Sequence, residues 1–290
     1  MPGILYVVAT PIGNLEDVTL RALRVLREVS VIAAEDTRRT ARLLQHYSIS
    51  TPTTSLHEHN EHWRSAKLIE RLAAGDSVAL VSDAGTPVVS DPGVHLVAAA
   101  HDHGIRVEPI PGANAAVAAI SAAGLPGDGF LFAGFPPTRS NARLKWLQAL
   151  TNHHRPIVLY EAPHRILGTL RDISTTFGGR KVAIARELTK THEILAVRPI
   201  ETWLEMPPPE RGEFTLVIAG AQAASLKVIP APSDQDVSVF FDRLTNNMGL
   251  ERRLALKATA EHFNVRARDV FAAVDRARVR SDDINLLDED

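Results

Sequence analysis

The sequence predicts an α/β fold made of two α/β domains, followed by a small helical module. Short apolar runs alternate with amphipathic stretches over the first two-thirds of the 290 residues. A Gly- and Pro-rich break falls at residues 124–129, and from residue 233 to residue 280 only helical spacing is present. Since a domain averages about 150 residues, this length fits two domains and a smaller third part.

The apolar runs are too short for helices and are bounded by turn-forming residues, so we expect mostly buried strands. They lie at residues 5–9, 31–34, 78–81, 107–110, 130–133, 157–160, 182–185 and 213–219. Apolar residues between them recur at helical spacing, which predicts helices at residues 19–30, 38–46, 62–74, 94–103, 113–123, 143–151 and 164–177. This alternation is typical of a largely parallel sheet with both faces covered.

Changes in composition along the chain predict the domain boundaries. We expect an N-terminal α/β domain over residues 1–123, a C-terminal α/β domain over residues 124–222, and the helical module over residues 233–281. Within the module, residues 250–274 predict a helix, a short turn at residues 262–265 and a second helix, as in a helix-turn-helix motif.

The composition excludes several classes of protein and site. With 32 Lys and Arg against 34 Asp and Glu, the net charge of -2 disfavours a globally basic nucleic-acid coat but allows a local basic patch. The absence of cysteine excludes disulfides, thiolate zinc sites, Fe–S clusters and a Cys nucleophile. No apolar run reaches the roughly 18–20 residues that span a bilayer, so we expect a soluble, cytoplasmic protein without a membrane segment.

Six predicted strands run out into polar or Gly- and Pro-rich segments, which begin at residues 10, 35, 82, 111, 161 and 186. Ligands of parallel α/β sheets sit outside the carboxyl ends of the strands, so these segments predict one cleft between the two domains. Ordinary turns could account for any one of them. Turns alone do not require the repeated Glu, Asp, Arg and Lys.

The segment at residues 82–93 (SDAGTPVVSDPG) predicts the kind of ligand. Neither a dinucleotide-binding glycine motif nor a phosphate-binding P-loop is present. Small residues followed by Pro87 let a ligand lie against bare backbone, which suits a nucleotide-like cofactor of low charge. His57, His59 and His62 resemble a metal cluster, but a polar loop entering a helix accounts for them better, so we predict no metal site.

Residues 10–15 (TPIGNL), 34–38 (AEDTR) and 82–93 resemble the tetrapyrrole-methylase superfamily of S-adenosylmethionine enzymes. With residues 160–165 (YEAPHR) and 186–190 (RELTK), they resemble more narrowly its ribosomal RNA small subunit methyltransferase I family. The resemblance covers about residues 5–220, and the helical tail resembles the family's C-terminal extension. It implies S-adenosylmethionine-dependent 2'-O-methylation of a cytidine ribose in the decoding region of small-subunit (16S) rRNA, by an enzyme that is commonly a homodimer.

The resemblance also implies which residues hold the cofactor in the interdomain cleft. They are Pro11, Ala84, Gly85, Thr86, Val89, Asn114, Ala115, Glu161 and Leu188. Thr86 replaces the Asp of the porphyrin-modifying relatives, which favours RNA over a porphyrinoid as the substrate. Methylation of a small substrate such as a porphyrinoid stays open as the alternative, as does a non-catalytic nucleic-acid-binding protein that uses the C-terminal helices.

Methyl transfer to a ribose hydroxyl requires orientation, removal of a proton and stabilisation of the developing alkoxide. The catalytic candidates at the strand ends are Lys190, Glu161 and Asp36, with Glu187 and His164 as further possible bases. Lys190 could act as a base or as an electrostatic stabiliser. Structural ion pairs between the loops are the other reading of these charges, and the sequence does not choose among them.

Two groups of arginines predict contacts with RNA phosphates, which guanidinium groups bind well. Arg38, Arg39 and Arg165 follow predicted strands, and Arg252, Arg253 and Arg266 lie in the helical module. Residues 240–280 carry nine basic against five acidic side chains, a local excess that suggests RNA binding. The alternative is a small bundle that packs on a dimer partner or caps the second domain.

Overall fold

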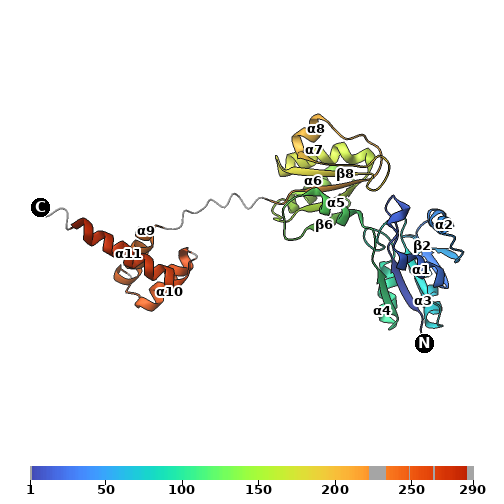
Figure 1. Ribbon diagram of the computed structural model, residues 1–290, viewed down its shortest axis with the longest axis horizontal. Helices are drawn as coiled ribbons and strands as arrows, with labels where there is room; N and C mark the ends of the chain where they lie inside the picture. The colour runs from blue at the N-terminus through green and yellow to red at the C-terminus, as the bar shows by residue number, and fades with distance from the viewer. Residues whose placement is uncertain (1, 222–232, 248, 264, 286–290) are drawn as a thin grey trace. The chain divides into compact units, whose positions relative to one another are not determined.

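The computed structural model describes residues 2–221, 233–247, 249–263 and 265–285 (Figure 1). The chain forms two compact units, Met1–Gln222 and Ala223–Asp290. The first unit contains both β-sheets, and the described part of the second is helical. No helix among the described residues is long and apolar enough to cross a membrane.

The first sheet is entirely parallel, with the strand order β3-β2-β4-β1-β5. Its strands are β1 (Ile4–Val8), β2 (Val31–Ala34), β3 (Thr53–Ser55), β4 (Val78–Val81) and β5 (Arg106–Ile110). Every residue of β2 and β4 is buried, as expected for central strands of a parallel sheet covered on both faces. The sequence did not predict β3, because three polar residues carry no apolar run.

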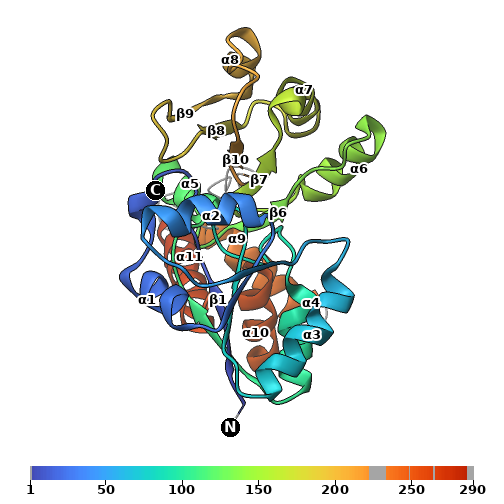
Figure 2. The same ribbon diagram turned by 90° about the vertical axis from the view of Figure 1, so that its right-hand side faces the viewer.

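Four helices cover the two faces of this sheet. They are α1 (Leu20–Glu28), α2 (Thr37–His46), α3 (Glu61–Ala73) and α4 (Val94–Asp102), and a short 3-10 helix, η1 (Leu15–Asp17), precedes α1. Leu26 of α1 and Leu44 of α2 pack with Val8 and Ile32 on one face. On the other face, α3 and α4 lie side by side (Figure 2) and pack on the alternate side chains of the same strands.

The second sheet is mixed, with the order β6-β7-β10-β8-β9. Its strands are β6 (Leu131–Gly134), β7 (Ile157–Glu161), β8 (Lys181–Arg186), β9 (Ile194–Pro199) and β10 (Phe214–Ile218). Only β6 and β7 pair in parallel. The expectation of a largely parallel sheet is therefore wrong here, because β10 runs antiparallel between β7 and β8, and the short connection from β8 to β9 allows only an antiparallel partner.

Helices also cover both faces of the second sheet. On one face pack α6 (Ser140–Leu150), α7 (Ile166–Phe177) and α8 (Ile200–Glu205), and η2 (Pro163–Arg165) precedes α7. On the other face packs α5 (Ala115–Ala123), whose alanines lie against Val158, Ala183 and Val217. A boundary at residues 123 and 124 would assign α5 to the first domain, whereas its buried face belongs to the core of the second sheet.

The second unit contains α9 (Asp234–Asp242), the π-helical turn η3 (Arg243–Asn247), α10 (Arg252–Phe263) and α11 (Ala267–Asn285). Val237, Phe241, Ala255, Val270 and Val274 form its small core. The predicted helix pair over residues 250–274 corresponds to α10 and the start of α11, and residue 264 of the predicted turn lies outside the described residues.

Candidate active site

A cavity of about 390 Å³ lies in the first unit, and loops of both sheets line it. Eight of the nine expected cofactor contacts lie on its wall: Ala84, Gly85, Thr86, Val89, Asn114, Ala115, Glu161 and Leu188. The ninth, Pro11, lines a smaller neighbouring pocket together with Arg39 and Asp83, two residues that both pockets share. The structure thus brings together residues that are more than a hundred positions apart in the sequence.

The loop of residues 82–93 is fixed to the ends of β1 and β5. Thr10 and Gly85 exchange two backbone hydrogen bonds, of 2.8 and 3.0 Å, and the Thr86 hydroxyl donates to the carbonyl oxygen of Ala113 at 3.2 Å. Gly85 has a φ of +81°, and a Cβ there would lie 3.3 Å from Cγ2 of Ile12. Val88 and Ser90 also have positive φ, of 71° and 68°. Such strained backbone persists only where its surroundings hold it, so the loop is preorganised.

The two halves of the first unit touch beside the cavity. The amide of Asn14 donates to Thr189 Oγ1 at 2.9 Å, and a Cβ on Gly13 would lie 2.6 Å from Lys190 Cγ and 2.8 Å from the Leu188 carbonyl oxygen. Only glycine permits so close an approach. The loop after β1 therefore packs directly on the loop between β8 and β9.

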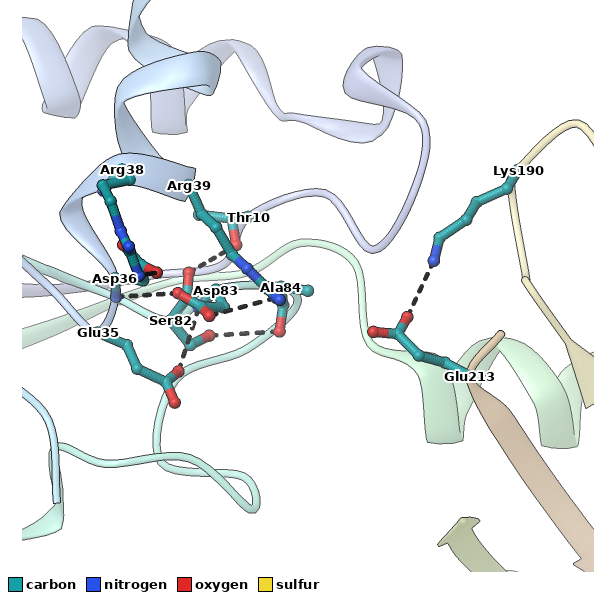
Figure 3. Close-up of polar contacts among 10 residues, drawn as sticks. All are labelled: Thr10, Glu35, Asp36, Arg38, Arg39, Ser82, Asp83, Ala84, Lys190 and Glu213. Carbon is teal, nitrogen blue, oxygen red and sulfur yellow. Dashed lines mark hydrogen bonds and ion pairs between the residues drawn. The ribbon is translucent and has the colours of Figure 1, made fainter. Parts of the chain in front are cut away.

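A network of polar contacts joins the ends of β2 and β4 (Figure 3). Asp83 accepts a hydrogen bond from the Asp36 amide at 2.9 Å, and its other carboxylate oxygen lies 3.3 Å from Arg39. Asp36 caps α2 and binds the Arg38 guanidinium at 2.7 Å, which holds the pKa of Asp36 well below its usual range. Asp36 and Arg38 do not line the cavity, whereas Arg39 does.

Two carboxylates of the cavity wall, Glu35 and Asp91, were not singled out from the sequence. Burial raises the pKa of Glu35, and burial together with the charge of Glu35 raises the pKa of Asp91 to about 6. Within residues 2–221, neither forms an ion pair with a basic side chain. A signal for Glu35 existed, because successive side chains at a strand end point to opposite sides and one of residues 35 and 36 had to face the cleft.

The carboxylate of Glu161 is fully buried and surrounded by donors. Its Oε2 accepts from the Thr169 hydroxyl at 2.5 Å, and its Oε1 accepts from the Ala162 amide at 2.7 Å and lies 3.2 Å from Arg165 Nε. Arg165 in turn donates to the carbonyl oxygens of Pro136 and Pro137. The structure therefore places both side chains in a buried protein network.

The Lys190 ammonium lies between two carboxylates, 2.9 Å from Glu187 and 3.0 Å from Glu213. Figure 3 shows the contact with Glu213. Partial burial alone would lower the pKa of Lys190, but these carboxylates outweigh it and raise that pKa. Burial likewise opposes the charge of Glu187, but hydrogen bonds from the Glu213 amide and Lys190 lower its pKa overall. Lys190 is therefore a stable cation at neutral pH. His164, the other possible base, is exposed and does not line the cavity.

Those basic side chains of the second unit that the structure describes, including Arg252, Arg253 and Arg266, are exposed. The Arg252 guanidinium lies 5.9 Å from the centre of the Phe271 ring, and Arg266 pairs with Asp269 at 2.9 Å. Among the described residues, no group of three or more His, Asp or Glu is arranged to hold a metal ion. Beside the histidines of residues 57–62, the buried Glu61 instead accepts from the amides of Gly93 and His95, at 2.9 and 2.8 Å, at the start of α4.

The family model of tetrapyrrole (corrin/porphyrin) methylases matches residues 4–203. A ribosomal RNA small subunit methyltransferase I from Pseudomonas aeruginosa is 51% identical over 226 residues, which cover 76% of this chain and 80% of the relative. A protein of the same name from Synechocystis sp. is 47% identical over 276 residues, 93% of this chain and 96% of the relative. The chain belongs to the ribosomal RNA small subunit methyltransferase I family. The resemblance found in the sequence is thus confirmed.

Solved structures show the same tetrapyrrole-methylase fold in more distant proteins. Uroporphyrin-III C-methyltransferase from Thermus thermophilus has a TM-score of 0.55 and 23% identity, covering 75% of this chain and 94% of its own. Diphthine synthase has a TM-score of 0.56 and 16% identity, covering 75% and 90%. The predicted fold class is therefore confirmed, and the methyltransferase I relatives are much more similar in sequence than the porphyrin enzyme.

Proposed function

We propose that the protein transfers the methyl group of S-adenosylmethionine to the 2' hydroxyl of a cytidine ribose in the decoding region of 16S rRNA. The observation that carries this proposal is the cavity of about 390 Å³, lined by small residues, in a chain of the methyltransferase I family. A porphyrinoid substrate has weaker support, because two structures of a uroporphyrin-III C-methyltransferase that this chain resembles are only 23% and 19% identical to it.

The cavity suits a nucleoside-like cofactor. Its volume lies in the usual range for small-molecule sites, and the backbone at Gly85 is open to a ligand that any larger side chain would displace. We propose contacts from Ala84, Gly85, Thr86 and Val89 on the first wall, and from Asn114, Ala115, Leu188 and the backbone of Glu161 on the second. Pro11 contributes from the adjoining pocket. When bound, S-adenosylmethionine supplies a methyl group on a positively charged sulfur, which leaves as a neutral thioether.

The protein must orient the ribose and accept its proton. We propose Asp91 as the proton acceptor, since its carboxylate lies on the cavity wall, has no cation partner within residues 2–221 and titrates near neutral pH. As the ribose oxygen bonds to the methyl carbon, the carbon–sulfur bond breaks with its electron pair to sulfur, and the proton passes to Asp91 and then to solvent. Burial, and after it the charge of Glu35, keeps the pKa of Asp91 high.

The three catalytic candidates from the sequence then have supporting roles. Lys190 holds the loop after β8 and adds a fixed positive charge, Asp36 orients Asp83 and Arg38, and Glu161 holds Arg165. For phosphate binding, Arg39 at the cavity and the exposed Arg38 are better placed than the buried Arg165. We also propose that Arg252, Arg253 and Arg266 bind rRNA phosphates from the second unit.

The remaining expectations concern assembly and location. We propose that the protein is a homodimer and acts in the cytoplasm on the rRNA or on the 30S particle, as the resemblance implies. Sedimentation velocity at micromolar concentration tests the oligomeric state. A monomer that is fully active on 30S particles would overturn the dimer.

The test of the function is methyl transfer from labelled S-adenosylmethionine to naked 16S rRNA, 30S particles and a porphyrinogen in parallel, without added metal. We expect label in RNA only, and expect it at a cytidine 2' oxygen when nuclease digests are analysed by mass spectrometry. Label in the porphyrinogen alone, or on a base instead of a ribose, would contradict the proposal.

A further inference from the structure

Phe135 presents a phenyl ring to the cavity that none of the roles above explains. The residue is 55% exposed and lies on the cavity wall. The centre of its ring lies 5.5 Å from that of Tyr160, which in turn packs against Phe132 at 4.9 Å. The Phe135 ring is thus supported by Tyr160, which Phe132 supports in turn, and its exposed side offers a flat apolar surface to a ligand.

The backbone that carries Phe135 is unusually well fixed. Two prolines follow it, which restrict the φ angles of the chain and disfavour helix at residue 135. The carbonyl oxygens of both prolines accept hydrogen bonds from Arg165, whose charge is balanced by the buried Glu161. A buried ion pair costs desolvation energy unless hydrogen bonds satisfy it, and here those bonds go to the segment that holds Phe135.

Phe135 also lies beside the loop that carries the proposed proton acceptor. A Cβ on the preceding Gly134 would lie 3.4 Å from Ser90 Oγ. Burial, and to a smaller extent the charge of Asp91, raises the pKa of Tyr160. Ser90, Asp91, Phe135 and Tyr160 therefore form one corner of the cavity. A nucleobase on the Phe135 ring would bring its own ribose toward Asp91.

We propose that Phe135 is the stacking platform for the target nucleobase of the RNA, and that the buried Glu161–Arg165 pair positions it. The inference rests on the proposed function and names the subsite of its substrate. Sequence-specific recognition of RNA uses unstacked bases, which can be held on aromatic side chains, and stacking on such a ring contributes about 1–3 kcal/mol per base. Gly85, Ala115 and Leu188 serve the cofactor instead.

The first test replaces Phe135 with Ala, Leu, Tyr and Trp. Since 1.4 kcal/mol is a factor of ten, Phe135→Ala should raise the KM for 30S particles by about 10- to 100-fold and leave the Kd of S-adenosylhomocysteine within twofold. Phe135→Tyr and Phe135→Trp should restore most of the lost affinity. Phe135→Leu, which is apolar but has no π face, should not. An unchanged KM in Phe135→Ala, or an equal loss of S-adenosylhomocysteine affinity, would overturn the proposal.

A second readout separates this inference from the methylation itself. An rRNA fragment with a fluorescent cytosine analogue at the target position should be quenched on binding the wild-type protein and not on binding Phe135→Ala. Quenching by the wild type without any methyl transfer would support the platform and contradict the proposed function. Methyl transfer with equal quenching by the two proteins would support the proposed function and contradict the stacking platform.

A double-mutant cycle tests the positioning role. Arg165→Lys keeps the positive charge but cannot reach both carbonyl oxygens, so it should raise the KM for 30S particles by less than Phe135→Ala does. If Arg165 acts through Phe135, the double variant should have the KM of Phe135→Ala alone. Additive effects on KM, at equal melting temperatures, would show that Arg165 contacts RNA or acts by another route.

Discussion

The two walls of the cavity are built by different means. The wall from the first sheet consists of small residues and strained backbone, as at Gly85, Val88 and Ser90, with carboxylates at its edge. The wall from the second sheet carries the aromatic rings of Phe135 and Tyr160. The ion pair of Arg165 with the buried Glu161 holds the segment that carries Phe135. Backbone with small side chains can approach a ligand closely but offers no flat apolar surface for stacking. Aromatic rings offer such a surface but prevent the backbone behind them from reaching the ligand. This contrast fits the proposal of two ligands, in which the cofactor lies against the small residues and backbone and a planar group of the substrate lies on the aromatic rings of the second wall.

Two Arg–carboxylate pairs show the same contrast. The Arg38 and Asp36 side chains are 89% and 25% exposed, whereas those of Arg165 and Glu161 are 15% and 0% exposed. An exposed ion pair stabilises the fold very little, so Arg38 can exchange its partner for an RNA phosphate at little cost. Breaking a buried pair by removing one partner costs about 3–5 kcal/mol, so Arg165 is held in place.

The largest effect should come from Asp91→Asn, which removes the proposed proton acceptor. Single-turnover methyl transfer should fall by about 10²–10⁴-fold, and the wild-type rate should decline below about pH 6, where Asp91 protonates. Asp102→Asn, at an exposed site at the end of α4, is the matched control. A loss of less than tenfold would assign the proton to another group, with Glu35 the nearest candidate.

The same substitution should stabilise the fold. Because the folded state raises the pKa of Asp91 to about 6, its charged form is unfavourable there. This group favours folding fully at low pH, and that contribution is lost as the pH rises through 6. Asp91→Asn should therefore raise the free energy of unfolding by about 1 kcal/mol at pH 7.5, after allowance for partial exposure, and by almost nothing at pH 4.

Gly85→Val should have the next largest effect, on the cofactor wall. Val at a φ of +81° is strained, and its Cβ would meet Ile12, so we expect the affinity for S-adenosylhomocysteine to fall by at least about 10- to 100-fold in calorimetry. Gly104→Val is the control, since Gly104 also has a positive φ, of 65°, but nothing lies within 4 Å of its Cβ position. Equal loss in both variants would mean that strain, and not the ligand, is responsible.

A smaller effect is expected from the basic side chains of the second unit. Changing Arg252, Arg253 and Arg266 to Glu should weaken 30S binding by about tenfold at moderate salt and flatten the plot of log affinity against log salt by about 2–3 units. Cofactor affinity should stay unchanged. If the module only packs against protein, the salt dependence will equal that of the wild type.

The smallest effect should follow Lys190→Ala. The raised pKa of Lys190 keeps it protonated, so it is not a base at neutral pH, and its loss should lower kcat by less than about tenfold. The pH profiles of the wild-type and Lys190→Ala rates should also have the same shape between pH 7 and pH 9. A loss of 10³-fold would mean that its charge acts on the reacting oxygen directly.

Much of the fold could be predicted from local pattern, and part of the site could not. Residues 31–34 and 78–81 are strands as expected, because strands buried on both faces give continuous apolar runs. The strand β9 escaped prediction, since its exposed and half-buried residues form a sheet edge rather than an apolar run. The partners of Arg165 and the position of Phe135 depend on contacts about 30 residues apart, which no local pattern contains.

The most direct test of the two-wall account measures two affinities in the same two variants. Each variant should change a different constant: Gly85→Val the Kd of S-adenosylhomocysteine, and Phe135→Ala the KM for 30S particles. We expect Gly85→Val to lose the cofactor product while still binding RNA, and Phe135→Ala to keep the cofactor product while its KM for 30S particles rises about 10- to 100-fold. If both variants weaken the same ligand, the two walls serve one ligand and the account is contradicted.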